Sequence, residues 1–266
     1  MVDVIIPAGG RIPAHFVRLV GTDCKPLIKF NDRTVLSTTI EALKASGIVN
    51  RIVVVGPQKV LHDESCREVF DRIPEGNTGP ENIFRGLDAL VRTSQPPVYV
   101  LIVTADLPFL TGDIVREFVT MCPSEKDFCV PLISLDEFQE VFPNATGTFV
   151  GLQDGKWTAG CMYLATATGL RKAIHHIEQV FQRRKSKLGM ARLLGFKFVW
   201  DLVCKKLTVS DVETKVRELL ACEGAAVPGS PPELAYDIDD KEDYYYALNY
   251  LKQQARKGEQ QATTSP

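Results

Sequence analysis

The sequence predicts an α/β fold, a three-layer sandwich with a mostly parallel central sheet and a smaller insertion in its second half. Three observations lead to this prediction. Short apolar runs alternate with segments of helical spacing along the first part of the 266-residue chain. The apolar runs have the length of strands that are buried on both faces, as strands of a parallel sheet are. Turn residues and then a helical segment follow these runs, which is the order of a βαβ unit.

The elements of the first half follow in order from this pattern. Residues 2–6 form a buried strand that runs into a tight turn at Gly9 and Gly10. A helix is expected at 34–46, where Gly47 ends it. After that helix the pattern predicts strands at 51–56 and 98–104, and helices at 83–91 and about 111–121.

The second half predicts a mixed set of elements. An Asp-Gly pair at 154–155 indicates a hairpin, and Ser210 opens a capping box at the start of a helix. The expected strands are 128–133, 148–152, 158–164 and 234–238, and the expected helices lie near 170–181, 210–220 and 240–257. No linker rich in Pro, Gly and Ser divides the chain, so we expect one domain at 1–257 and a disordered tail at 258–266.

The composition argues against several classes of protein. Lys and Arg number 31 and Asp and Glu 33, and a net charge of −2 gives no overall attraction to nucleic acid or to anionic membranes. No apolar run approaches the roughly 18–20 residues that cross a bilayer, and no basic region precedes an apolar stretch as in a signal peptide. Seven scattered cysteines without a C-x-x-C pair predict neither a disulfide framework nor a zinc site. We therefore expect a reduced, cytoplasmic protein.

The turn after the first strand is a candidate phosphate-binding loop. Gly9 and Gly10 would expose backbone N–H groups, which suit phosphate oxygens. Arg11 follows at once and would grip the same oxygens with its forked donors. Lys25, held before Pro26 at the start of an extended segment, would neutralise a phosphate as a point charge. The alternatives are a tight turn that needs positive φ and a solvated lysine.

Carboxylates at two places suggest a magnesium site. Asp106 lies just past the carboxyl end of the strand at 98–104, the edge where α/β sheets bind ligands. Its alternative role is to cap the turn that follows. Asp237 and Asp239 alternate along an expected strand, so only one of them is expected to face the same ion as Asp106. The other would cap the last helix.

A run of basic residues at 183–187 closes the long helix of the second half. Complementation of the helix dipole is its ordinary explanation. The alternative is an anion site for a phosphorylated acceptor, for which Arg183 and Lys187 are the candidates because helical spacing places them on one side. The four histidines have no metal-ligand spacing, and no G-x-S-x-G motif supports a hydrolytic triad.

Four segments, in this order, suggest a family. They are Pro-Ala-Gly-Gly-Arg at 7–11, Lys-Pro-Leu at 25–27, Val-Thr-Ala-Asp-Leu-Pro-Phe-Leu at 103–110 and Asp-Ile-Asp-x-x-Glu-Asp at 237–243. Together they resemble the MobA-like nucleotidyltransferases, NTP transferases of the GT-A or nucleotide-diphospho-sugar transferase type. The resemblance implies a Mg²⁺-dependent enzyme that moves NMP from an NTP to a small, phosphorylated acceptor and releases pyrophosphate. It also implies an NTP-binding half at 1–125 and an acceptor half at 126–257, with no nucleic-acid or membrane partner.

The resemblance further implies a role for each candidate residue. Arg11 and Lys25 would be the catalytic cations. The nucleotide would be held by Ala8, Gly9, Gly10, Arg11, Lys25, Asp106 and, at the base, Asn82. The metal ligands would be Asp106 with Asp237 as the first choice and Asp239 as the second.

Two alternatives to this function stay open. The family's glycine loop usually reads A-G-G-x-S-x-R-M-G, whereas Arg11-Ile12-Pro13 follows the glycines here and the second arginine is missing or displaced to Arg18. Lys241 also stands where the late motif usually has a proline. The chain is alternatively a GT-A glycosyltransferase that uses Asp237-x-Asp239 as its metal motif, or a degenerate module that binds a nucleotide without turnover.

Overall fold

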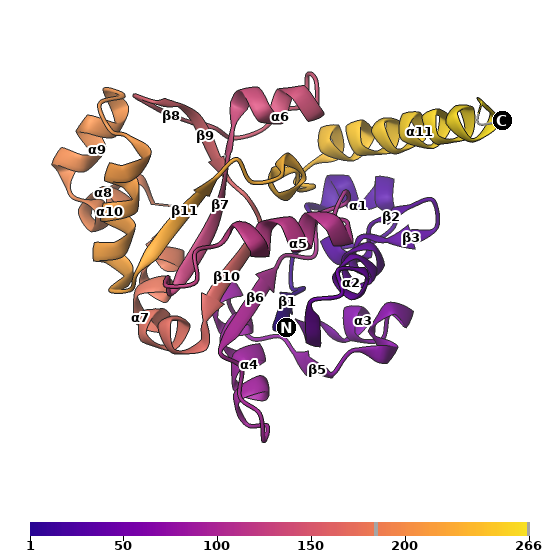
Figure 1. Ribbon diagram of the computed structural model, residues 1–266, viewed down its shortest axis with the longest axis horizontal. Coiled ribbons are helices and arrows are strands. Elements are labelled where there is room, and N and C mark those ends of the chain that lie inside the picture. Colours follow the sequence, from indigo (N-terminus) through magenta and orange to yellow (C-terminus); the bar gives the residue numbers. More distant parts are fainter. Residues whose placement is uncertain (184–185, 265–266) are drawn as a thin grey trace.

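A large sheet runs through the computed structural model, which describes residues 1–183 and 186–264 (Figure 1). Its strands lie in the order β5-β4-β1-β6-β10-β7-β9-β8, and β11 pairs with β7. The strands are β1 (Val2–Pro7), β4 (Val49–Gly56), β5 (Asp71–Pro74), β6 (Tyr99–Val103), β7 (Phe128–Ser134), β8 (Val150–Leu152), β9 (Gly155–Ala159), β10 (Met162–Thr166) and β11 (Gly224–Pro228). A separate small ribbon joins β2 (Lys29–Phe30) to β3 (Arg33–Thr34).

The first half of the sheet is parallel, as predicted. β1 lies between β4 and β6 and is parallel to both, and β5 is parallel to β4. In the second half β10 runs antiparallel to β6 and β7, and the hairpin β8–β9 continues the sheet from β7. The carboxyl ends of β1 and β6 therefore open at the same edge of the sheet.

Helices cover both faces of the sheet, which confirms the three-layer prediction. They are α1 (Ala14–Val20), α2 (Val35–Ala45), α3 (Gln58–Leu61), α4 (Gly79–Val91), α5 (Gly112–Met121), α6 (Leu135–Val141), α7 (Ala167–Arg183), α8 (Lys187–Leu194), α9 (Phe196–Val203), α10 (Val209–Leu220) and α11 (Lys241–Thr264). Val4 and Ile6 of β1 pack in one core with residues of α2 and α5. Ile5, which points to the other face, packs in a second core with residues of α4 and α7.

A third, aromatic cluster anchors the segment before α11 to the loop after β6. The Phe109 ring centroid lies 4.8 Å from that of Tyr236, 4.9 Å from that of Tyr250 and 5.1 Å from that of Phe142. Because Asp106 lies three residues before Phe109 and Asp237 follows Tyr236, this cluster holds two of the candidate site residues near each other.

The expected strand at 234–238 was wrong. A 3₁₀ turn (Pro232–Ala235) occupies its beginning, and the residues after it pair with no strand in the described chain. Pro231 and Pro232 supply no backbone N–H, so a regular ladder does not start there. The backbone continues along the loop after β6 instead, where the Ile238 N–H donates to the Asp106 carbonyl over 3.3 Å.

Two helix ends also differ from the prediction. The capping box of α10 is formed by Thr208 and Asp211, two residues earlier than the expected start at Ser210. The backbone of α11 continues through Thr264, although the sequence predicted a disordered tail after 257. Gly258 is followed by Glu and Gln, which favour a helix; the expectation for 265–266 falls outside the described residues. No helix in the described chain is long and apolar enough to span a membrane.

Candidate active site

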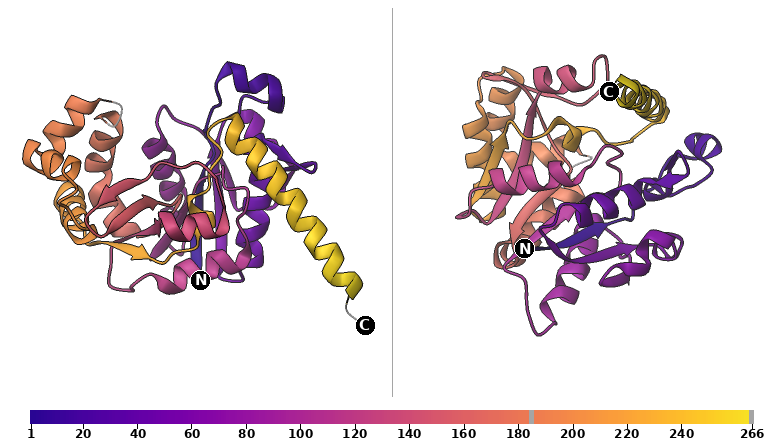
Figure 2. Two further views of the ribbon diagram at one scale, coloured as in Figure 1. Left: turned by 90° about the horizontal axis from the view of Figure 1, so that it is seen from above. Right: turned by 45° about the vertical axis from the view of Figure 1, so that its right-hand side comes forward.

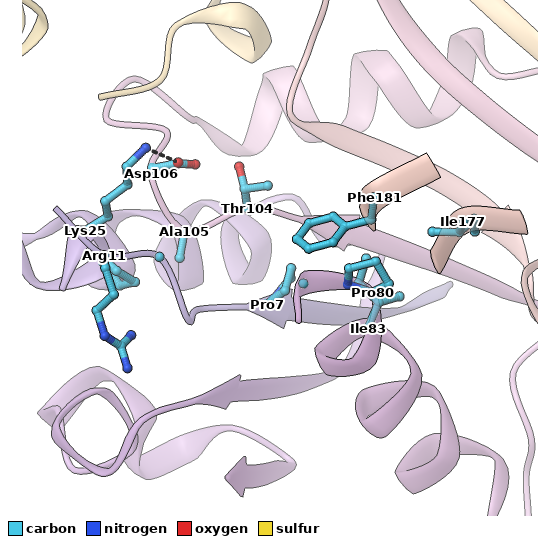
Figure 3. A pocket seen from close by; sticks show the side chains of 13 residues that line it. Pro7, Arg11, Lys25, Pro80, Ile83, Thr104, Ala105, Asp106, Ile177 and Phe181 are labelled. Atoms are coloured by element: carbon cyan, nitrogen blue, oxygen red, sulfur yellow. Dashed lines mark hydrogen bonds and ion pairs between the residues drawn. The ribbon is translucent and has the colours of Figure 1, made fainter. Parts of the chain in front are cut away.

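The loops after β1 and β6 border one cavity of about 510 Å³ at the carboxyl edge of the sheet (Figure 3). Gly10 and Arg11 line it from the first loop, and Thr104 and Asp106 from the second. Lys25 closes it at one end. The structure thus brings the predicted glycine turn, lysine and strand-end aspartate to one place.

Backbone contacts to the glycine loop place Lys25. The Lys25 N–H donates to the Gly10 carbonyl over 3.0 Å, and Arg11 forms an isolated antiparallel bridge with Cys24. Pro26 then sets the backbone for a 3₁₀ turn (Lys25–Leu27). A Cβ at Gly10 would lie 3.3 Å from Cδ of Lys25, so the glycine leaves room for the lysine stem. The ammonium is carried into the site at only 14% side-chain exposure.

The Lys25 ammonium lies among carboxylates. Its Nζ is 3.4 Å from Oδ2 of Asp106 and also pairs with Asp239. Burial alone would lower the pKa of Lys25, but the charges of Asp106, Asp239 and Asp237 outweigh it and raise that pKa. The lysine therefore enters the site as a permanent cation.

Asp237 is the carboxyl group of this cluster whose ionised form is disfavoured by its surroundings. Burial, followed by the negative charges of Asp106 and Asp239, raises the pKa of Asp237 to about 7. The sequence argument placed Asp237 and Asp239 on opposite sides of a strand; because the segment is not a strand, both charges act on Lys25. An ionised Asp237 needs more positive charge than Lys25 alone provides.

The carboxylates fit a divalent cation. Oδ1 of Asp106 is buried and finds no hydrogen-bond partner in the described chain, so it is available to a cation. Within the described residues no group of three or more His, Cys, Asp or Glu side chains is arranged to hold a metal ion. Mg²⁺ commonly uses only one or two carboxylates and completes its shell with substrate phosphates and water. Two carboxylates, those of Asp106 and Asp237, are therefore enough protein ligands for Mg²⁺.

Arg11 is turned away from Lys25 (Figure 3). Its guanidinium donates to the Gly9 carbonyl over 2.8 Å and pairs with the carboxylate of Glu75. That carboxylate lies over the glycine loop, because a Cβ at Gly9 would meet Glu75 Oε2 at 2.7 Å. The predicted phosphate grip of Arg11 thus requires it to leave Glu75.

Asn82 fastens the loop before α4 to the glycine loop. It is buried in the first turns of α4, and its Oδ1 accepts from the Gly76 N–H over 2.7 Å. Its Nδ2 would lie 2.9 Å from a Cβ at Gly9. Asn82 therefore lies beside the candidate nucleotide site, with its carbonyl oxygen already engaged.

The sequence matches the family model for the MobA-like NTP transferase domain over residues 4–183. The chain belongs to the MobA-like NTP transferase family. It is a nucleotidyltransferase, and it has the fold that solved structures of such enzymes share. No curated protein sequence matches it.

Solved structures similar to this MobA-like transferase extend over nearly the whole chain. A hypothetical transferase from Thermus thermophilus is 27% identical with a TM-score of 0.80, and the match covers 91% of this chain and 98% of that one. The 2-C-methyl-D-erythritol 4-phosphate cytidylyltransferase of Thermus thermophilus is 19% identical, with a TM-score of 0.54 and coverage of 94% and 98%. A nucleotidyl transferase from Methanothermobacter thermautotrophicus is 17% identical, with a TM-score of 0.54 and coverage of 95% and 99%. The last two show the fold alone.

The other end of the cavity in this MobA-like transferase is apolar. Pro80 and Ile83 of α4 face Ile177 and Phe181 of α7 across it (Figure 3). Phe181 lies at the end of the helix expected near 170–181, and nothing in the sequence indicates that this helix reaches α4. Their contact joins segments about 100 residues apart in sequence, so no local pattern reports it.

Of the two predicted acceptor residues, Arg183 alone has a described side chain. It is exposed at the end of α7 and does not line this cavity. The side chain of Lys187 lies outside the described residues, as do Arg184 and Lys185. The acceptor role of Arg183 and Lys187 therefore stays a prediction.

A second cavity of about 450 Å³ lies next to the carboxylates in this transferase. Asp237 and Asp239 line it, together with Thr146, Thr148, Thr158 and other residues of the second half. No Lys or Arg is among its described lining residues. Glu75, Thr146 and Thr158 were not selected from the sequence; an acidic residue between a strand and a helix start was the only signal for Glu75.

Proposed function

We propose that this nucleotidyltransferase transfers NMP from an NTP to a small acceptor and releases pyrophosphate, with Mg²⁺ as its cofactor. The observation that supports this proposal is the contact of the Lys25 ammonium with Asp106 and Asp239, directly beside the glycine loop. The acceptor oxygen would attack the α-phosphorus and form a new P–O bond. The bond between the α-phosphorus and its bridging oxygen would break, and pyrophosphate would leave with that oxygen.

Charge and positioning are the work of the protein in such a reaction. Gly9 and Gly10 would direct backbone N–H groups at the triphosphate. Lys25 would neutralise charge that develops on the α-phosphate and on the leaving pyrophosphate, and Arg11 would join it after leaving Glu75. Asp106 and Asp237 would hold Mg²⁺, with Asp239 as the alternative to Asp237. The ion, when bound, neutralises phosphate charge and favours an in-line arrangement.

The nucleoside would occupy the rest of the first cavity. Pro80, Ile83 and Phe181 offer an apolar surface on which a flat base can lie. Asn82, fixed beside Gly9, is the candidate for a polar contact with the base. A catalytic site that spans Lys25 at one end and Phe181 at the other has room for a whole nucleotide.

The second cavity is the proposed place of the acceptor. Its threonine hydroxyls and aspartates favour an acceptor that presents hydroxyl or amino groups to it. The basic run at 183–187 stays the alternative grip for a phosphorylated acceptor, as the sequence suggested. In either arrangement the reacting oxygen would approach past Asp237.

Pyrophosphate release from each of the four NTPs, with Mg²⁺ and a panel of acceptors, tests the proposal. Lys25→Ala should lower kcat/KM by about 10²–10³, equivalent to about 3–4 kcal/mol, because a buried cation near the transferring phosphate is lost. Lys29→Ala, at an exposed position of β2, is the matched control and should have no effect. Wild-type turnover by Lys25→Ala would refute the assignment. Consumption of a nucleotide sugar without pyrophosphate would indicate a glycosyltransferase, and binding without turnover a degenerate module.

A further inference from the structure

One end of the molecule, formed by α8 and α9, presents large apolar side chains to solvent. Leu188 is 55% exposed, Phe196 and Trp200 are each 66% exposed, and Val203 is 72% exposed. We call these four residues the α8–α9 face. Phe196, Trp200 and Val203 are spaced by four and three residues, so they form one stripe along α9. Phe196 and Trp200 are the most exposed aromatic side chains in the described chain.

The same segment is strongly basic. Residues 183–206 contain eight Lys or Arg and one Asp, a net charge of +7 within a chain of net charge −2. The rest of the chain therefore carries −9. The described and exposed cations of this segment are Arg183, Arg192, Lys197, Lys205 and Lys206. The near-neutral net charge of the whole chain thus combines a basic segment at 183–206 with an acidic remainder.

The opposite side of α9 contacts α10. Lys215 of α10 lies over the Phe198 ring, with Nζ 5.9 Å from its centroid. Phe198, Val199 and Leu202 are all only partly exposed. Helical spacing thus places Phe196 and Trp200 on the side of α9 away from Phe198. This helix lies at the end of the molecule away from α11 (Figures 1 and 2).

We propose that the α8–α9 face binds the surface of an anionic lipid bilayer, with Phe196 and Trp200 at the level of the headgroups. Trp and Phe on an exposed helix suit the boundary between headgroups and acyl chains, and the cations of the same segment suit anionic lipids. Helices of eight residues are too short to cross the bilayer, so α8 and α9 would lie on it. The net charge of −2 for the whole chain does not reveal this basic segment.

The charges and shape favour a bilayer over other occupants. A second copy would bring an equally positive face against this one, and like charges would repel. Single-stranded nucleic acid binds in grooves where bases stack on aromatic rings. Here the rings stand on the outside of a helix beside Leu188 and Val203, which offer nothing to a base.

Tryptophan fluorescence of the full chain with vesicles tests the proposal. The chain has two tryptophans, so Trp157→Phe leaves Trp200 as the single reporter. With vesicles containing about 30% phosphatidylserine at low salt we expect a blue shift and quenching by brominated acyl chains. Binding should weaken at least tenfold at about 0.5 M salt, where exposed charges are screened. It should also be at least tenfold weaker to vesicles of phosphatidylcholine alone.

A sedimentation assay with vesicles separates the contribution of the inserted aromatic side chains from that of the basic side chains. The variants are made in the wild-type background. Phe196→Ser with Trp200→Ser should reduce vesicle binding at least tenfold, and Lys197→Glu with Lys206→Glu should do the same without removing an apolar group. Tyr245→Ser, at a 48% exposed aromatic on α11, is the matched control and should bind as the wild type does. Unchanged circular dichroism and thermal unfolding show that the variants fold.

Several outcomes would overturn the proposal. They are a wild-type protein that does not sediment with anionic vesicles at low salt, binding unaffected by either pair of substitutions, and a dimer that these substitutions dissociate. Binding of a single-stranded oligonucleotide that the same substitutions abolish, without vesicle binding, would assign the face to nucleic acid. None of these measurements depends on turnover, so they stand apart from the test of the transferase reaction.

Discussion

At the scale of single residues, the two catalytic cations proposed here have different neighbours. Lys25 is already among Asp106 and Asp239, whereas Arg11 is held by Glu75. Glu75 keeps a negative charge above Gly9, where the backbone is otherwise suited to an anion. The free protein therefore holds the candidate phosphate loop in a form that a bound triphosphate would have to displace.

Replacing Glu75 tests this competition. Glu75→Gln should strengthen NTP binding several-fold, because it removes a like charge from the phosphate loop and releases Arg11. The gain is limited to about 0.5–1 kcal/mol because the ion pair is partly exposed. Isothermal titration with an NTP and Mg²⁺ measures it, and Glu68→Gln, in an exposed surface pair, is the control. Weaker binding would instead show that Glu75 contacts the substrate.

Asp237 predicts a pH dependence of stability in the metal-free protein. Its pKa is raised to about 7 by burial and by neighbouring carboxylates, against about 3.9 for a free Asp. Between these values the folded state binds the extra proton, so this group's contribution makes stability fall as pH rises from about 4 to 7. Asp237→Asn removes that loss. In urea unfolding with EDTA the variant should be more stable than wild type by about 1–2 kcal/mol at pH 8, with the difference vanishing near pH 4. An equal difference at both pH values would contradict the assigned cause.

At the scale of elements, the approach of α4 to β1 sets the position of the glycine loop. Gly86 of α4 lies against Ile5, and a Cβ there would come within 2.6 Å of Ile5 Cγ2. The same strand ends three residues before Gly10. Close packing of α4 on β1 therefore positions both Asn82 and the candidate phosphate loop.

Gly86→Ala tests this packing. The methyl group should destabilise the protein by about 1–3 kcal/mol, because overpacking outweighs the gain in helix propensity. The double variant with Ile5→Ala should lose less than the sum of the single losses, since the clash is relieved. Chemical denaturation of the four proteins measures the coupling. Additive losses would show that the two residues do not compete for space.

The parts of this site that local patterns report were predictable from sequence, and the parts that depend on distant contacts were not. Strand and helix periodicity predicted β1, β6 and the turns that carry Gly10 and Asp106. The segment at 234–238 was misassigned because its alternation suggests a strand, while Pro231 and Pro232 prevent one. Glu75 reaches the site because β5 pairs with β4 and the Glu75 N–H donates to the Gly56 carbonyl, and Phe181 reaches it because α7 packs against α4. Neither contact is encoded by a local sequence pattern.

At the scale of the whole molecule, the sheet joins two cavities that meet at the carboxylates. The first is bordered by the parallel strands and the second by elements of the later half. Binding of a nucleotide to the first cavity should stabilise the fold as a unit, because its lining comes from segments between Pro7 and Phe181.

Thermal unfolding with nucleotides measures that coupling. An NTP with Mg²⁺ at about 100 times its Kd should add about 2.7 kcal/mol to the free energy of unfolding. For a chain of this length each kcal/mol raises Tm by about 2–4 °C, so a rise of about 5–10 °C is expected with the preferred NTP. Asp106→Asn should abolish the part of the rise that depends on Mg²⁺. Equal shifts with and without Mg²⁺ would contradict the proposed metal site.

The contact between Lys25 and Asp239 joins a residue that lines the first cavity to one that lines the second. The two cavities are thus linked by a pair of opposite charges as well as by backbone, since the Thr104 N–H at the first donates to the Cys161 carbonyl at the second. A triphosphate bound to Lys25 as proposed would compete with Asp239 for the same ammonium, so nucleotide binding would weaken this contact between the two cavities. If the two cavities hold the NTP and the acceptor as proposed, this competition would favour an ordered reaction in which the NTP binds before the acceptor.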